Sequence, residues 1–277
     1  MGSILSTSVK QTTNPIVEKL MFPAPTPSYG KFHAKLQFVG SGKNKVACMF
    51  NIINNKRLVI LYAHGNGTDI GYIDNFLARL AEEADINIIS YDYEGYGLTK
   101  PSDGGLSDGR PSEIGAIRST EIVYDYLINH SPMKYTASDI ILYGTSIGTG
   151  PVVDLATKLA DAGIHVRGIL LQTPYTSIFG VVSESLETSC YYSCNQESNP
   201  NMFRTHEKIG KIMSKIIIVH GLKDEVIAYS NAERLRDACK LGCATLVTIP
   251  SATHNNIERN HFNVLLKCIT QLIYSSK

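Results

Sequence analysis

Charge is scarce in this sequence, and the charges that are present nearly cancel. Charged residues make up 18% of the 277 residues, and 26 Lys and Arg stand against 25 Asp and Glu, which leaves a formal net charge of +1 at pH 7. A protein that binds nucleic acid usually carries a basic excess that neutralises phosphates. The composition gives no such electrostatic footprint, so we expect no nucleic-acid partner.

Long apolar runs are also missing. No run approaches the roughly 18 residues that a membrane-spanning helix requires. The opening MGSILSTSVK lacks the apolar stretch of a secretory signal. Apolar residues nevertheless make up 43% of the chain, enough at this length to bury a substantial core, which excludes global disorder. We therefore expect a soluble protein made in the cytosol.

The six cysteines lack a metal-binding pattern. Cys190 and Cys194, like Cys239 and Cys243, have a C-x3-C spacing, whereas a zinc ribbon uses C-x2-C, and neither pair has a convincing histidine nearby. In a cytosolic chain such cysteines stay reduced. We predict ordinary thiols, and neither a metal nor another cofactor.

After residue 57, short apolar runs alternate with amphipathic segments. Buried parallel strands have continuous runs of Ile, Val and Leu because both faces of the sheet are covered. The segments between them carry apolar residues at helical spacings of three and four. This alternation predicts an α/β protein with one doubly wound, mostly parallel sheet. The predicted strands are 58–62, 86–91, 140–143, 168–171, 216–220 and 244–249.

The N-terminal part follows a different pattern. Residues 1–31 are predicted to be a tail with a proline-rich lead-in, because closely spaced prolines disfavour a helix. The runs 32–39 and 45–53 flank a glycine-rich turn and predict an antiparallel hairpin. Two later stretches, 99–112 and 190–202, are predicted to be a surface loop and a short excursion over the sheet edge, with no large lid. We expect a single domain over residues 32–277.

The sequence GTSIG at 144–148 fits G-x-S-x-G, and its setting strengthens the match. An apolar strand precedes it and a helical segment follows it, which is the strand–turn–helix context of a nucleophile elbow. The serine of such a turn is strained, and its flanking glycines avoid collisions with neighbouring backbone. Ser146 is therefore the predicted nucleophile.

A serine nucleophile needs a base and an acid that orients the base. In folds with this elbow the chain order is Ser, Asp or Glu, then His. Asp224 follows the strand 216–220, and His254 follows the strand 244–249. All three residues come after carboxyl ends of predicted strands, where open α/β sheets place their sites. Asp224 is the predicted acid and His254 the predicted base.

Other residues compete for these roles. Glu225 is the alternative acid, but the chain is expected to turn there. His220 lies within a strand run, and His64 precedes Ser146 in the chain, so we expect His64 to brace its loop. Asp92 and Glu94 suggest a carboxylate pair, but their position at a strand end favours a structural turn.

The predicted oxyanion hole uses two backbone N–H groups. One belongs to Ile147, directly after the nucleophile, and the other to Asn66 in the loop HGNGTD at 64–69. The acyl pocket is expected to come from residues 175–205. Its candidate lining, for which burial in the core is the simpler alternative, is Tyr175, Ile178, Phe179, Tyr191 and Tyr192.

The segments HGNG (64–67), YDYEGYG (91–97), ILYGTSIGTGPVVDLA (141–156), VHGLKDEVI (219–227) and HNNIE (254–258) together resemble the α/β-hydrolase domain-containing 17 family of depalmitoylases. The similarity covers about residues 17–275. It implies an α/β-hydrolase fold and hydrolysis of a thioester between palmitate and a protein cysteine. By motif position the family's nucleophile, acid and base fall on Ser146, Asp224 and His254.

The N-terminus departs from that family, which carries a palmitoylated cysteine cluster there. The first cysteine here is Cys48. Instead, MGSILS satisfies the M-G-x-x-x-[ST] pattern for myristate on Gly2. One myristoyl chain gives only weak binding, with K about 10⁴ M⁻¹. We therefore expect a cytoplasmic protein with weak peripheral membrane contact. The loop 99–112 is also longer than expected of the family.

These observations favour a serine hydrolase that forms an acyl-enzyme, with S-acylated proteins or other acyl compounds as substrates. A serine peptidase-like activity or a general carboxylesterase is the alternative, because the same triad serves both. A non-catalytic binding module is disfavoured by the complete set of triad and oxyanion residues.

Overall fold

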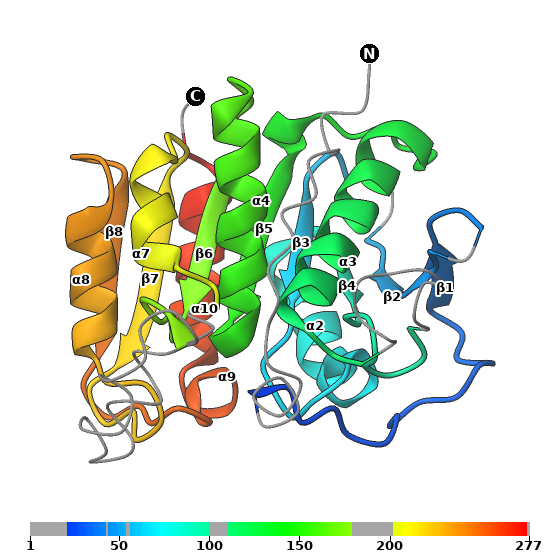
Figure 1. The fold of residues 1–277 in the computed structure, drawn as a ribbon, viewed down its shortest axis with the longest axis horizontal. Coiled ribbons are helices and arrows are strands. Elements are labelled where there is room, and N and C mark those ends of the chain that lie inside the picture. The colour runs from blue at the N-terminus through cyan, green and yellow to red at the C-terminus, as the bar shows by residue number, and fades with distance from the viewer. Residues whose placement is uncertain (1–20, 43, 54–55, 100–109, 179–201, 276–277) are drawn as a thin grey trace, which may run out of the picture.

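A computed structural model of the chain describes residues 21–42, 44–53, 56–99, 110–178 and 202–275. Within these residues, eight strands form one sheet in the order β1-β2-β4-β3-β5-β6-β7-β8, and helices cover both of its faces (Figure 1). Gly2, Phe179, Tyr191 and Tyr192 lie outside the described residues, as do most of the predicted loop 99–112 and nearly all of the predicted excursion 190–202.

The predicted parallel sheet is confirmed. β3, β4, β5, β6, β7 and β8 run parallel to one another, and each differs from its predicted bounds by at most two residues at either end. Nearly every side chain from β3 to β7 is buried, as continuous apolar runs require. The bounds are β3 Val59–Ala63, β4 Asn87–Tyr91, β5 Ile140–Thr145, β6 Gly168–Gln172, β7 Ile216–Gly221 and β8 Ala244–Ile249.

The predicted N-terminal hairpin is present, but its first strand is shorter than expected. β1 (Leu36–Val39) pairs antiparallel with β2 (Val46–Asn51), which pairs antiparallel with β4. The prediction that the first strand begins at residue 32 was wrong. The backbone there turns twice, with the N–H of His33 donating to Gly30 and the N–H of Leu36 donating to His33. Those groups are therefore unavailable to the ladder, and Phe32 is fully exposed.

The helices divide into two layers that follow the alternation of side chains along each strand. α2 (Ile70–Ala84) and α10 (Phe262–Ile273) pack on the face that includes Ile60 and Tyr62. α3 (Glu113–Asp125), α4 (Thr149–Asp161) and α8 (Ser230–Ala238) pack on the opposite face (Figure 1). Among the described residues no helix is long and apolar enough to cross a membrane.

The carboxyl ends of the parallel strands meet at one edge of the sheet. The short helix α9 (Ile257–Asn260) lies at this edge, and the N-terminal lead-in runs along the same lower edge in Figure 1. Loops from both halves of the sheet therefore converge there.

Candidate active site

The turn between β5 and α4 has the geometry of a nucleophile elbow. Ser146 has a φ of 51°, in the left-handed region that non-glycine residues rarely occupy. A Cβ on Gly144 would lie 2.5 Å from the carbonyl oxygen of Gly148, and one on Gly148 would lie 2.3 Å from that of Ala63. Both glycines are therefore required by close backbone approach, and they leave Ser146 at the end of β5.

Three strand ends bring serine, histidine and aspartate into one chain of contacts. Nε2 of His254 lies 3.1 Å from Oγ of Ser146. Nδ1 of the same ring lies 2.9 Å from Oδ2 and 3.1 Å from Oδ1 of Asp224. Since both oxygens of a carboxylate accept, Nδ1 carries the hydrogen and Nε2 is free to take the serine proton.

The carboxylate of Asp224 is buried and accepts several hydrogen bonds. Its side chain is 0% exposed, and Oδ1 accepts the backbone N–H groups of Val226 at 2.9 Å and Ile227 at 2.8 Å. Burial acts to raise the pKa of Asp224, but hydrogen bonds from His220, His254 and the Ile227 backbone hold that pKa well below its usual range. Asp224 is therefore an anion at neutral pH.

Glu225, the alternative acid, contacts the same loop at a different atom. Its Oε2 accepts the backbone N–H of His254 at 3.2 Å, and it has no hydrogen bond to the imidazole. The ring nitrogen faces Asp224 instead. The geometry therefore gives Glu225 a contact with the main chain and Asp224 the contact with the base.

The loop after β3 approaches the nucleophile from the other half of the sheet. A Cβ on Gly65 would lie 3.7 Å from Cβ of Ser146, so this part of the loop borders the serine. The side chain of Asn66 holds the loop in place: Nδ2 donates to the carbonyl of Met21 at 2.7 Å, and Oδ1 accepts from the hydroxyl of Tyr96 at 2.7 Å. The assignment of the Asn66 and Ile147 N–H groups to an oxyanion hole stays a prediction.

Two buried carboxylates tie the lead-in to this half of the sheet. The backbone N–H of Ser28 donates to Asp69 at 2.6 Å, and its hydroxyl donates to the same carboxylate. The hydroxyl of Tyr29 donates to Asp92, which also accepts the N–H of Ile70 at 3.0 Å. Sequence reasoning missed these contacts, because the prolines indicated only that the lead-in is not helical.

His64 lies beneath the loop and contacts it from inside. Its ring is fully buried, its Nδ1 lies 2.7 Å from the carbonyl of Gly65, and its centroid lies 4.2 Å from that of Tyr93. Its Nε2 lies 3.4 Å from Oδ1 of Asp92 and has no hydrogen-bond partner among the described residues. This placement suits a residue that braces the loop.

Only two of the five candidate pocket residues are described. Tyr175 and Ile178 are buried in the core. The Tyr175 hydroxyl donates to the carbonyl of Ile147 at 3.1 Å, and its ring packs at 6.3 Å from that of Phe203. Tyr175 therefore supports the backbone after the nucleophile. An acyl-binding role for the five residues stays a prediction.

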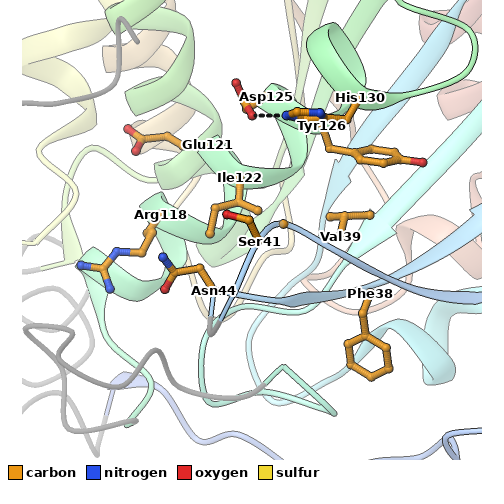
Figure 2. Close-up of a pocket in the computed structure, with 11 residues that line it drawn as sticks. Phe38, Val39, Ser41, Asn44, Arg118, Glu121, Ile122, Asp125, Tyr126 and His130 are labelled. Carbon is orange, nitrogen blue, oxygen red and sulfur yellow. Dashed lines mark ion pairs between the residues drawn. The ribbon is translucent and has the colours of Figure 1, made fainter.

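A separate open groove of about 780 Å³ lies between the β1–β2 hairpin and α3. Figure 2 shows Phe38 and Val39 on the hairpin side and Arg118 and Ile122 on the helix. None of the triad residues lines it, so the groove does not belong to this site.

Cys239 and Cys243 are free thiols in the described part of the chain. Burial, with a smaller contribution from the nearby Cys243, raises the pKa of Cys239 to about 12. Within the described residues, no group of three or more His, Cys, Asp or Glu side chains is placed to hold a metal ion.

The fold is that of known α/β-hydrolases. The esterase Pf2001 of Pyrococcus furiosus superposes with a TM-score of 0.67 at 13% identity, over 91% of this chain and 97% of that one. An alpha-beta hydrolase from Vibrio vulnificus gives a TM-score of 0.66 at 18% identity, over 86% of this chain and 81% of that one. These likenesses place the chain in the α/β-hydrolase fold class.

Sequence comparison narrows the assignment. The human alpha/beta hydrolase domain-containing protein 17B is 33% identical over 217 residues, which are 78% of this chain and 67% of that protein. The mouse protein 17C is 31% identical over 78% of this chain and 60% of that protein. No protein-family model matches the chain. The chain belongs to the α/β-hydrolase domain-containing 17 family, and this membership supports hydrolase activity.

Proposed function

We propose that the protein is a serine hydrolase that acts through an acyl-enzyme, with Ser146 as nucleophile, His254 as base and Asp224 as the acid that orients the base. The observation that carries this proposal is the contact chain from Ser146 Oγ through the His254 ring to Asp224, at 3.1 and 2.9 Å. A nucleophile and base within hydrogen-bond reach, with the base held by a third group, is the arrangement that activates a serine.

In the acylation step, Oγ of Ser146 attacks the carbonyl carbon of the substrate while Nε2 of His254 takes the hydroxyl proton. The negative charge that develops on the carbonyl oxygen is received by the N–H groups of Ile147 and Asn66. One such donor typically stabilises the transition state by roughly 2.7–4 kcal/mol. The imidazolium, stabilised by the Asp224 anion, then donates its proton to the departing thiol or alcohol, and the acyl group stays on Ser146.

In the deacylation step, the same groups act on water. His254 takes a proton from a water molecule, the resulting hydroxide attacks the acyl carbon, and the tetrahedral intermediate collapses with the proton returned to Oγ of Ser146. The free acid leaves, and the triad is restored.

The proposed substrate is a protein that carries palmitate on a cysteine at a membrane surface. The resemblance to depalmitoylases supports this class. A thioester carbonyl is also less stabilised by resonance than an ester or amide and expels a good leaving group, so a serine triad attacks it readily. General carboxylesterase and peptidase-like activities are the alternatives that use the same triad.

Two measurements test the nucleophile and the substrate class separately. A fluorophosphonate should label the wild-type protein covalently and leave Ser146→Ala unlabelled, while both proteins show the same thermal unfolding. Substrate class is then read from kcat/KM on a palmitoyl-thioester peptide, a matched oxygen ester and an amide. We expect the thioester to be cleaved fastest. A preference for the amide would contradict the depalmitoylase proposal, and equal thioester and ester rates would leave a general acyl hydrolase.

A further inference from the structure

The triad has a neighbour that the mechanism above does not use. His220 lies near the end of β7, four residues before Asp224, and its side chain is 0% exposed. Its Nε2 lies 3.2 Å from Oδ2 of Asp224 and 2.9 Å from the carbonyl oxygen of Ile227. Its Nδ1 is buried and has no hydrogen-bond partner among the described residues.

These contacts define the protonation state of the His220 ring. A carboxylate and a carbonyl both accept hydrogen bonds, so Nε2 carries a hydrogen and donates it. A hydrogen on Nδ1 would be a buried donor without an acceptor. This would destabilise the folded state more than leaving the lone pair of Nδ1 without a hydrogen-bond donor. The single N–H of Nε2 therefore lies between two acceptors, the carbonyl of Ile227 at 2.9 Å and Oδ2 of Asp224 at 3.2 Å.

The two histidines share one oxygen of the acid. Oδ1 of Asp224 accepts the N–H groups of Val226 and Ile227, whereas Oδ2 lies 2.9 Å from His254 Nδ1 and 3.2 Å from His220 Nε2. A donor from His220 fixes the rotation of the carboxylate and draws electron density away from the oxygen that faces His254. Among the groups that lower the pKa of Asp224 against the raising effect of burial, His220 is the largest.

His220 contacts the carbonyl of Ile227 in the loop that carries Asp224, but two backbone bonds beside the loop that carries His254 do not involve it. The N–H of Leu222 donates to Ile249 at 3.1 Å, and the N–H of Lys223 donates to Ala252 at 3.0 Å. These bonds join the end of β7 to the loop that carries His254. Loss of the imidazole should therefore leave that loop in place.

We propose that His220 is a positioning residue of the triad: its Nε2–H orients Asp224 and limits how strongly that carboxylate favours the charged form of His254. This inference rests on the proposed serine-hydrolase function. The other titratable groups at this point are Glu225, bonded to the His254 backbone, the exposed Lys223, and Tyr229 of α8, whose ring centroid lies 5.8 Å from that of His220.

The first test compares His220→Phe with His220→Gln. Phenylalanine keeps a ring against Tyr229 but has no donor, and the Gln amide can place an N–H near the position of Nε2. One hydrogen bond to a charged group corresponds to roughly a tenfold to hundredfold change, so we expect a loss of that size in kcat for His220→Phe with KM nearly unchanged. The acidic limb of the kcat/KM profile should move to higher pH, because a less engaged carboxylate favours the imidazolium. His220→Gln should recover most of the rate and restore the profile.

Matched controls separate this effect from general damage. Tyr229→Phe removes a hydroxyl that contacts Thr248 and keeps the ring against His220, so its rate and profile should match the wild type. If His220→Phe does not fold, His220→Asn replaces it in the comparison, because Asn has the same amide as Gln but is one methylene shorter. Equal rates and pH profiles for His220→Gln and for His220→Phe, or for the shorter His220→Asn in its place, would overturn the proposal.

A second readout does not depend on catalysis. In the Ser146→Ala background, protonation of the His254 ring can be followed by NMR across pH, with and without the His220 substitution. We expect the midpoint to move to higher pH when the donor is lost, and an unchanged midpoint would overturn the inference. If the wild-type protein hydrolysed no substrate and reacted with no fluorophosphonate, the proposed function would fail, while the NMR titration would still decide whether His220 acts on His254 through Asp224.

Discussion

In each half of the molecule, an aspartate at the sheet edge lies next to a histidine. In the C-terminal half, Nδ1 of His254 lies 2.9 Å from Asp224 and the side chain of His254 is 10% exposed. In the N-terminal half, Nε2 of His64 lies 3.4 Å from Asp92 and both side chains are 0% exposed. The residue types are the same, so their surroundings must account for any difference in role.

The difference lies in what the second ring nitrogen faces. The free nitrogen of His254 faces the hydroxyl of Ser146, whereas Nδ1 of His64 faces the carbonyl of Gly65 in its own loop. A base must meet a group that can lose a proton, and a carbonyl has none to lose. Asp92 also accepts from Tyr29 and Ile70, so it holds the lead-in and α2 in place. The geometry of the first pair therefore suits proton transfer, and that of the second suits holding a loop in place.

The largest effect should come from removing the base. His254→Ala should lower kcat on an activated ester by about 10⁶-fold, because no other side chain in the described part of the chain is bonded to Oγ of Ser146. It should change the free energy of unfolding by less than about 1 kcal/mol. Steady-state kinetics and chemical denaturation measure the two quantities. Triad members act as one unit, so adding Ser146→Ala should cause little further loss, and a fully additive loss would contradict the assignment.

The next effect concerns the acid. Asp224→Asn should lower kcat by about 10⁴-fold, because an amide no longer selects the Nδ1–H tautomer or stabilises the imidazolium. Glu225→Gln is the matched control and should keep the rate within about tenfold of the wild type, since Glu225 bonds to the backbone of His254 and not to its ring. If Glu225→Gln were the more damaging change, the acid would be misassigned.

Disrupting the pair of His64 and Asp92 should mainly lower the stability of the protein. His64→Ala removes a buried ring that packs against Tyr93 and Tyr96, and should lower the free energy of unfolding by roughly 2–4 kcal/mol. Its rate loss, measured on the folded fraction, should be orders of magnitude smaller than that of His254→Ala. A variant that kept full stability and lost all activity would show instead that His64 takes part in the chemistry.

The smallest effect should come from Asn66→Ala. This change keeps the backbone N–H that is predicted to meet the oxyanion and removes the side-chain contacts to Met21, to Tyr96 and to the N–H of Gly67. We expect a loss of less than tenfold in kcat and about 1 kcal/mol in unfolding free energy. A loss of 10²–10³-fold, the size typical of a missing oxyanion donor, would mean that the side chain is the donor.

Local pattern explains what could be predicted from the sequence. The six parallel strands contain short runs rich in Ile, Val and Leu, so the local sequence pattern predicts them to within two residues. Once their order is known, residues that follow strand ends must meet at one edge, and this brings Ser146, Asp224 and His254 together although 108 residues separate the first from the last.

The missed contacts have no local signature. The position of His220 within a strand argues against a role as the base. The loop that carries Asp224 nevertheless folds back onto the end of that strand. The spacing of four residues between His220 and Asp224 is the signal in the sequence that points to this contact. The bonds from Ser28 to Asp69 and from Tyr29 to Asp92 span 41 and 63 residues. No periodicity encodes contacts of that kind, because they depend on how a non-periodic segment lies across the finished sheet.

Because the lead-in is attached to the loop beside Ser146, immobilising the protein through its N-terminus should affect the site more than immobilising it through its C-terminus. The carbonyl of Met21 accepts a hydrogen bond from Asn66, so tension on the chain at Met21 reaches the loop beside Ser146. The other end leaves from α10, where the guanidinium of Arg167 holds the carbonyl of Ile273 beside the start of β6, at the edge of the sheet away from the triad. Protein immobilised through its C-terminus should therefore keep more of its turnover than protein immobilised through its N-terminus by a short, taut linker, and a long slack linker should remove the difference.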